Sequence, residues 1–65
     1  MKREFQRVLA GMSMDDVEAV LGPPEESHAT SFGAERMTTW AYRADGRRLF
    51  IWFDEDGRVK LKSNV

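Results

Sequence analysis

A short helical segment with a stop signal at each end limits the folds open to this chain more than any other feature. Ser13 is a favourable N-cap, and Asp16, three residues later, takes the place of the usual Glu or Gln of a capping box. Gly22, Pro23 and Pro24 end the segment, because glycine accepts a left-handed cap conformation and proline cannot continue a helix. A helix of roughly two turns is too short to be stable alone. The segment must therefore pack on another part of the chain.

A second helical pattern precedes this one. From Lys2 to Ala10 the apolar residues recur at helical spacing, and Gly11 stands where a left-handed C-terminal cap is expected. Both patterns are amphipathic, so each predicted helix has one face to bury. The apolar residues are Phe5, Val8 and Leu9 in the first pattern, with Met12 next at the same spacing, and Met14, Val17, Val20 and Leu21 in the second.

From Arg36 onward the apolar period changes to two, which is typical of strands. Turn signals at Asp45-Gly46 and at residues 54–57 divide this part into three strands of an antiparallel meander. Residues 25–35 are polar and small, and they predict a loop. The sequence thus predicts an α+β fold of order α-α-β-β-β, with two short N-terminal helices packed on one face of a three-stranded sheet.

The length of the chain limits its stability. Its 65 residues are enough for one domain, 1–65, whose core is marginal. It contains no cysteine and one histidine, so neither a disulfide nor a zinc-type metal site can staple the fold, and no cofactor is expected. Oligomerisation or a partner surface is the remaining way to bury more area. The formal net charge of −1 lacks the basic excess of nucleic-acid-binding proteins, so no nucleic-acid partner is expected.

The middle predicted strand is apolar on both faces. Alternation places Leu49, Ile51 and Phe53 on one face. It places Phe50 and Trp52 on the other. We expect the helices to cover the first face and to leave the second open. The other residues expected in the covered core are Trp40, Tyr42, Val59 and Leu61.

On the open face, Phe50 and Trp52 predict a binding surface for a protein partner or for a second copy of the chain. Lys60 and Lys62 are expected to supply a cationic rim around the two rings. Burying two such rings contributes on the order of 3–6 kcal/mol of apolar transfer free energy, which would help a marginal domain. The alternative is that Lys and Arg stems cover the rings and that the rest of the face is solvated.

A third group of candidate residues is basic. Arg43, Arg47 and Arg48 flank the first predicted hairpin turn and are candidates for binding an anion, such as a phosphate or a lipid headgroup. The alternative is an ordinary solvated hairpin end. His28 lies in the predicted loop with no supporting groups for catalysis, so no catalytic residue and no metal ligand set is predicted.

Three segments, in this order, resemble the BamE domain family, also called SmpA/OmlA. They are GMSMDDVEAVLGPP (11–24), TTWAYR (38–43) and LFIWFDEDGRV (49–59). The resemblance covers nearly the whole chain and implies an α+β sandwich of two helices on a three-stranded sheet. It also implies a structural rather than catalytic role for the residues that match, which are Gly11, Met12, Val17, Leu21, Gly22, Pro24, Trp40, Phe53 and Gly57.

The resemblance also implies a function. Members of the BamE family are mostly small lipoproteins on the periplasmic face of the outer membrane, where they belong to the machinery that inserts β-barrel proteins. They act by binding partner proteins and are not known as enzymes. The resemblance therefore implies a non-enzymatic protein-interaction module, and membrane contact is expected only on this ground.

Two features depart from the family pattern. The sequence as given lacks a signal peptide and a lipid-accepting cysteine, and Phe50 and Trp52 stand where more polar residues are expected. As written, the chain is therefore expected in the cytoplasm, as a free-standing adaptor or regulatory protein of unknown partner. If it is the mature part of a longer chain, the periplasmic face of the outer membrane is expected instead.

Overall fold

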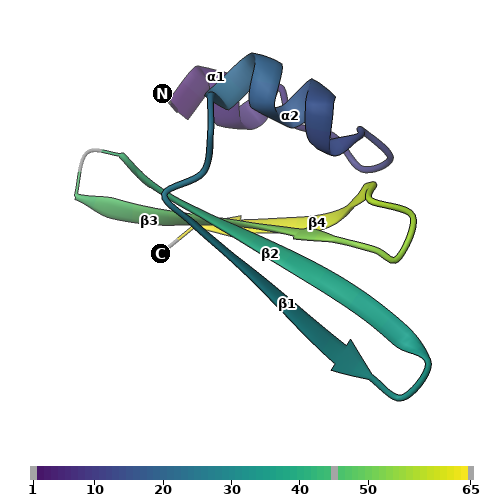
Figure 1. Ribbon diagram of the computed structural model, residues 1–65. Coiled ribbons are helices and arrows are strands. Elements are labelled where there is room, and N and C mark those ends of the chain that lie inside the picture. Colours follow the sequence, from purple (N-terminus) through teal and green to yellow (C-terminus); the bar gives the residue numbers. More distant parts are fainter. Residues whose placement is uncertain (1, 45, 65) are drawn as a thin grey trace.

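Two short helices lie over one face of a four-stranded antiparallel sheet (Figure 1). The computed structural model describes residues 2–44 and 46–64, which leaves Asp45 of the first predicted turn outside the described residues. The strands are hydrogen-bonded to one another in chain order. The elements are α1 (Lys2–Gln6), α2 (Met14–Leu21), β1 (Glu26–Phe32), β2 (Glu35–Ala44), β3 (Arg47–Phe53) and β4 (Val59–Asn64).

The predicted three-stranded sheet is wrong, because most of the predicted loop forms the edge strand β1. This strand pairs with β2 along its whole length, beginning with Glu26 opposite Ala41. Its described side chains are all exposed, so it has no apolar alternation by which it could be recognised. Main-chain pairing and a tight turn at Gly33 (φ 59°) place it in the sheet. The element order is therefore α-α-β-β-β-β.

The first helix is shorter than its apolar spacing predicts, since it ends at Gln6 rather than at Ala10. Gly11 does not cap this helix. Its N–H donates to the carbonyl oxygen of Val59 (2.8 Å), and the N–H of Val59 donates to the carbonyl oxygen of Met12 (2.8 Å). Pairing with the start of β4 therefore takes the place of further helical turns.

The second predicted helix is confirmed as α2, together with both of its caps. The Ser13 hydroxyl accepts from the N–H of Asp16 (3.1 Å), and the Asp16 carboxylate accepts from the N–H of Ser13 (3.4 Å), which completes a capping box. Gly22 ends the helix with a φ of 81°, and its N–H donates to the carbonyl oxygen of Glu18 (2.7 Å). Val17 is fully buried beneath the helix, so α2 is stabilised by the packing that its short length requires.

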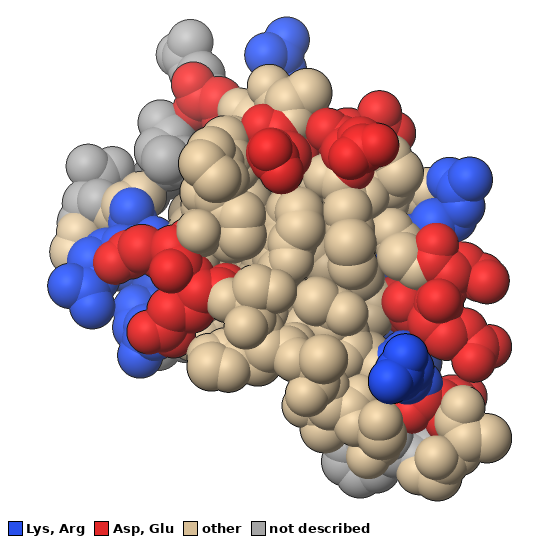
Figure 2. Space-filling view, in the orientation of Figure 1, with Lys and Arg blue, Asp and Glu red and all other residues tan. Residues whose placement is uncertain are grey.

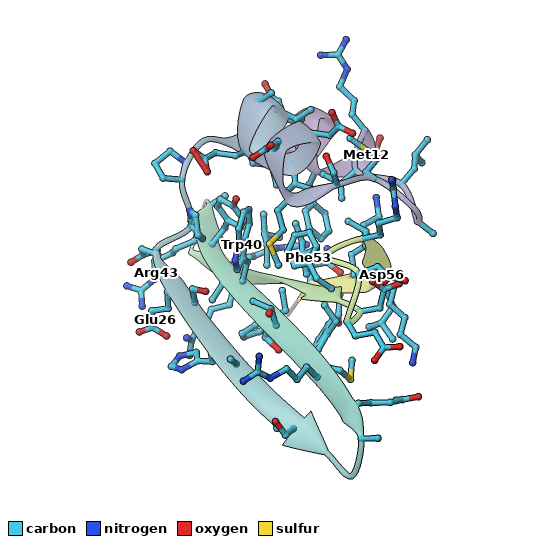
Figure 3. All side chains as sticks on the ribbon, turned by 45° about the vertical axis from the view of Figure 1, so that its right-hand side comes forward. Met12, Glu26, Trp40, Arg43, Phe53 and Asp56 are labelled. Carbon is cyan, nitrogen blue, oxygen red and sulfur yellow. The ribbon has the colours of Figure 1, made fainter. Side chains whose placement is uncertain are left out.

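The core lies between the helices and the near face of the sheet. The rings of Trp40 and Phe53 meet edge to face at its centre, with centroids 4.7 Å apart (Figure 3). The prediction that the helices cover the Leu49, Ile51 and Phe53 face of β3 is confirmed. The buried core residues are Phe5, Val8, Val17, Trp40, Tyr42, Leu49, Ile51, Phe53 and Val59.

Leu61 is the exception to the predicted core. Phe53 pairs with Val59 and Trp52 pairs with Leu61, so Lys60 is an extra residue that forms a β-bulge in β4. One extra residue reverses the alternation of the residues that follow it. Leu61 therefore lies on the face opposite the helices, where it is 48% exposed.

Candidate functional site

The face of the sheet opposite the helices is uncovered in the described part of the chain (Figure 1). Pairing of Phe50 with Ala41, and of Trp52 with Leu61, places these four residues on that face. Met37 shares it, because it lies four residues before Ala41 on the same strand. We call Met37, Ala41, Phe50, Trp52 and Leu61 the open-face patch.

The two aromatic rings form the middle of the open-face patch. The centroids of Phe50 and Trp52 are 5.9 Å apart and their planes are tilted by 37°. Both side chains are half-buried, and Ala41 is buried between its neighbours. The prediction that these rings lie away from the helices is confirmed, whereas their role in binding stays a prediction.

Charged side chains form a rim beside Phe50. The guanidinium carbon of Arg48 lies 5.3 Å from the Phe50 centroid, and Nη2 of Arg48 lies 3.8 Å from Oε2 of Glu26. Nε2 of His28 lies 3.4 Å from the same carboxylate oxygen. All three side chains are exposed, so these contacts are weak and easily exchanged. Arg48 covers Phe50 as the solvated alternative expects, but no described cation lies over Trp52 in this way.

The two predicted rim lysines lie in different places. Lys62 pairs with Ile51 and so lies on the covered face, where its ammonium group donates to the carbonyl oxygen of Phe5 (2.8 Å). Its predicted place on the open face is wrong, because the bulge reverses the alternation after Lys60. Lys60 is exposed in the bulge and lines a small hollow with Met37. It remains a candidate rim residue.

The three predicted anion-binding arginines are divided between the two faces. Arg43 and Arg48 pair with each other on the open face, and Figure 3 shows Arg43 and Glu26 at the same edge of the molecule. Arg47 lines a cavity on the covered face. In the view of Figure 2 basic and acidic side chains are mixed on both sides, so this view presents no uniformly basic surface. An anion-binding role for Arg43 and Arg48 stays a prediction.

The residues that carry the family resemblance hold the helices to the sheet. The N–H of Met14 donates to the carbonyl oxygen of Gly57 (3.2 Å), and the Tyr42 hydroxyl donates to that of Gly22 (2.8 Å). Burial raises the pKa of Tyr42 to about 12, and the Glu18 carboxylate adds to this shift. The matching residues lie in the core, at α2 and its flanks, or in the β3–β4 turn, and are Gly11, Met12, Val17, Leu21, Gly22, Pro24, Trp40, Phe53 and Gly57.

Two parts of this surface are not indicated by the sequence. Leu61 belongs to the open-face patch because of a bulge at Lys60, and the residues around Lys60 carry no local signal for one. Glu26 and His28 belong to the rim because β1 is a strand rather than a loop. Gly33, at the turn between β1 and β2, is the one signal that could have indicated a hairpin there.

No group of three or more His, Asp or Glu side chains among the described residues could hold a metal ion. No helix in the described part of the chain is long and apolar enough to cross a membrane. Comparison with protein-family models, with curated proteins and with solved structures finds no match to this chain. Function is therefore inferred from the open-face patch and the residues around it.

Proposed function

We propose that the protein is a non-enzymatic interaction module that binds a partner protein through the open-face patch. The observation that carries this proposal is the pair of rings, Phe50 and Trp52, side by side on a sheet face that no described helix covers. Leu61, which is 48% exposed, extends their apolar surface. Aromatic residues at the centre of an exposed apolar patch are typical of protein-binding surfaces, because removing them from water supplies much of the affinity.

The rim selects a partner that presents apolar side chains with a carboxylate beside them. Arg43 and Arg48 lie on the open face, and Arg48 is already positioned over Phe50. The contact of Arg48 with Glu26 is long (3.8 Å) and exposed, so a carboxylate of the partner can join or replace it at little cost. A partner carboxylate at this position would set the orientation of the complex and raise its rate of association.

The resemblance to the BamE family supports the same class of function. On this resemblance, the partner would be a component of the β-barrel assembly machinery of the outer membrane. This support comes from the shared motifs alone. The sheet has the additional strand β1 and so differs from the three-stranded sheet that the resemblance implies. A free-standing adaptor that uses the same patch in the cytoplasm is the alternative form of the proposal.

Leu61→Ser and Leu9→Ser form a matched pair for testing this proposal. Both leucines are exposed, at 48% and 63%, although the helical spacing of Leu9 predicts burial. Only Leu61 lies in the open-face patch. Both variants are expected to keep the fold, which far-UV circular dichroism checks. The wild-type chain captures its partner from an extract, and the captured protein is then purified and titrated against each variant by calorimetry.

Leu61→Ser and Trp52→Ser are each expected to weaken binding of the purified partner by about tenfold or more. Leu9→Ser is expected to bind as the wild type does. The proposal would be contradicted if Leu9→Ser weakened partner binding as much as Leu61→Ser does, or if Trp52→Ser left partner binding unchanged. Sedimentation of the isolated chain tests self-association. If the wild type is a dimer and Trp52→Ser is a monomer, the open-face patch binds a second copy of the chain rather than a partner protein.

A further inference from the structure

A cavity of 340 Å³ opens on the covered side of the sheet, away from the open-face patch. It lies between α1, which contributes Phe5, and the ends of three strands. Ala44 comes from the end of β2, Arg47 from the start of β3 and Asn64 from the end of β4. The proposed interaction function makes no use of this space.

The floor of the cavity is apolar. Phe5 and Leu49 are 8% and 4% exposed, and Ala44 is half-buried beside them. The volume falls at the lower end of the range of roughly 300–1,000 Å³ that is usual for small-molecule sites. The cavity is therefore large enough for a small ligand whose apolar part would be removed from water.

Two cations lie at the wall and mouth of the cavity. The ammonium group of Lys62 donates to the carbonyl oxygen of Phe5 (2.8 Å) and lies 4.9 Å from its ring centroid. An ammonium group has three N–H donors, so this one hydrogen bond does not use all of its donor capacity. Arg47 is exposed at the mouth, and no Asp or Glu belongs to the described lining of the cavity. The described lining therefore presents positive charge beside an apolar floor.

We propose that this cavity binds a small organic anion with an apolar tail, of the class of medium-chain carboxylates. The carboxylate accepts hydrogen bonds from Lys62 and Arg47. Such charge-assisted hydrogen bonds are stronger than those between neutral groups. The tail lies against Phe5 and Leu49. A neutral ligand leaves the two cations unmatched, and a small anion without a tail leaves the apolar floor in water. Both parts of the ligand are therefore needed.

Octanoate below its micellar concentration is the probe, and amide chemical shifts of the full chain are the readout. The expected result is a saturable titration in which the shifts are confined to residues around the cavity, such as Phe5, Leu49 and Asn64. Octanol, which has the tail without the charge, and acetate, which has the charge without the tail, should each bind at least tenfold more weakly. Octanol binding as tightly as octanoate, or no saturable shift at millimolar octanoate, would overturn the proposal.

Arg47→Gln and Arg43→Gln form the matched pair of variants, because the two exposed arginines flank the same turn on opposite faces. Arg47→Gln should weaken octanoate binding by about fivefold to tenfold, and Arg43→Gln should leave it unchanged. Equal effects of the two variants would overturn the site. Displacement of octanoate by vesicles of an anionic phospholipid would overturn the assignment to a free carboxylate. The cavity and the open-face patch share no residue, so either proposal can fail while the other stands.

Discussion

The hydroxyl of Tyr42 donates a 2.8 Å hydrogen bond to the carbonyl oxygen of Gly22, which joins the sheet to the C-terminal end of α2. Gly22 caps this helix, and the last carbonyl groups of a helix have no partner within it. Tyr42 is 5% exposed and belongs to the core. One side chain therefore packs in the core and satisfies the helix end, which joins α2 to the covered face of the sheet.

Tyr42→Phe tests this junction, because it removes the hydroxyl and keeps the ring. The Gly22 carbonyl oxygen then loses its partner, and we expect the free energy of unfolding to fall by about 1 kcal/mol. Urea denaturation followed by circular dichroism measures this, and the m-value should stay constant because the buried area is nearly the same. An unchanged midpoint would show that the hydrogen bond contributes nothing to stability.

The titration of Tyr42 predicts how stability depends on pH. Burial raises its pKa in the folded protein to about 12, from the ordinary value of 10.0 for a phenol, so the folded state favours the neutral phenol. As the pH rises, the unfolded chain loses this proton first. The contribution to stability is therefore fully present below about pH 10 and is lost between about pH 10 and 12. Tyr42 is the single tyrosine of the chain, so tyrosinate absorbance reports it directly. A titration midpoint near pH 10 in the folded protein would show that the Tyr42 hydroxyl is not buried.

The parts of this fold that could be predicted from the sequence are those whose signals are local. Ser13, Asp16 and Gly22 define both ends of α2 by hydrogen bonds within the helix and its caps, so its limits do not depend on the rest of the chain. The alternation of Phe50 and Trp52 against their neighbours likewise assigns the two faces of β3. The same alternation predicts that the two rings that carry the proposed function lie on one face of β3.

The parts that could not be predicted depend on pairing between distant segments. β1 is held by its main-chain bonds to β2, and the polar side chains of His28 and its neighbours give no apolar pattern. α1 ends early because Gly11 pairs with Val59, which lies far along the chain. The residue types around Lys60 do not indicate the bulge there. Because of the bulge, Leu61 lies on the open face and Lys62 lies on the covered face, the reverse of what simple alternation predicts.

Deleting Lys60 tests the bulge. Without the extra residue, Phe53 still faces Val59 and Trp52 still faces Leu61, so the faces of β4 are unchanged. We expect the variant to fold with a free energy of unfolding within about 1 kcal/mol of the wild type. Nuclear Overhauser contacts between the Leu61 methyl groups and the Trp52 ring should be present in both proteins. Their absence from the wild type, with appearance only on deletion, would show that β4 has no bulge.

Hydrogen exchange tests the unpredicted edge strand β1 and, with it, the rim of the proposed binding surface. Amides of β1 that bond to β2 should exchange more slowly than loop amides, because the two strands pair from Glu26 to Phe32. They should exchange faster than those of β3, because β1 is an edge strand whose described side chains are all exposed. Two-dimensional NMR in deuterated buffer resolves both groups in one experiment, and Ile51 in the core serves as the protected reference. Exchange across β1 at the rate of an unstructured loop would remove Glu26 and His28 from the rim, and Arg48 would then be free to meet a carboxylate of the partner without competition.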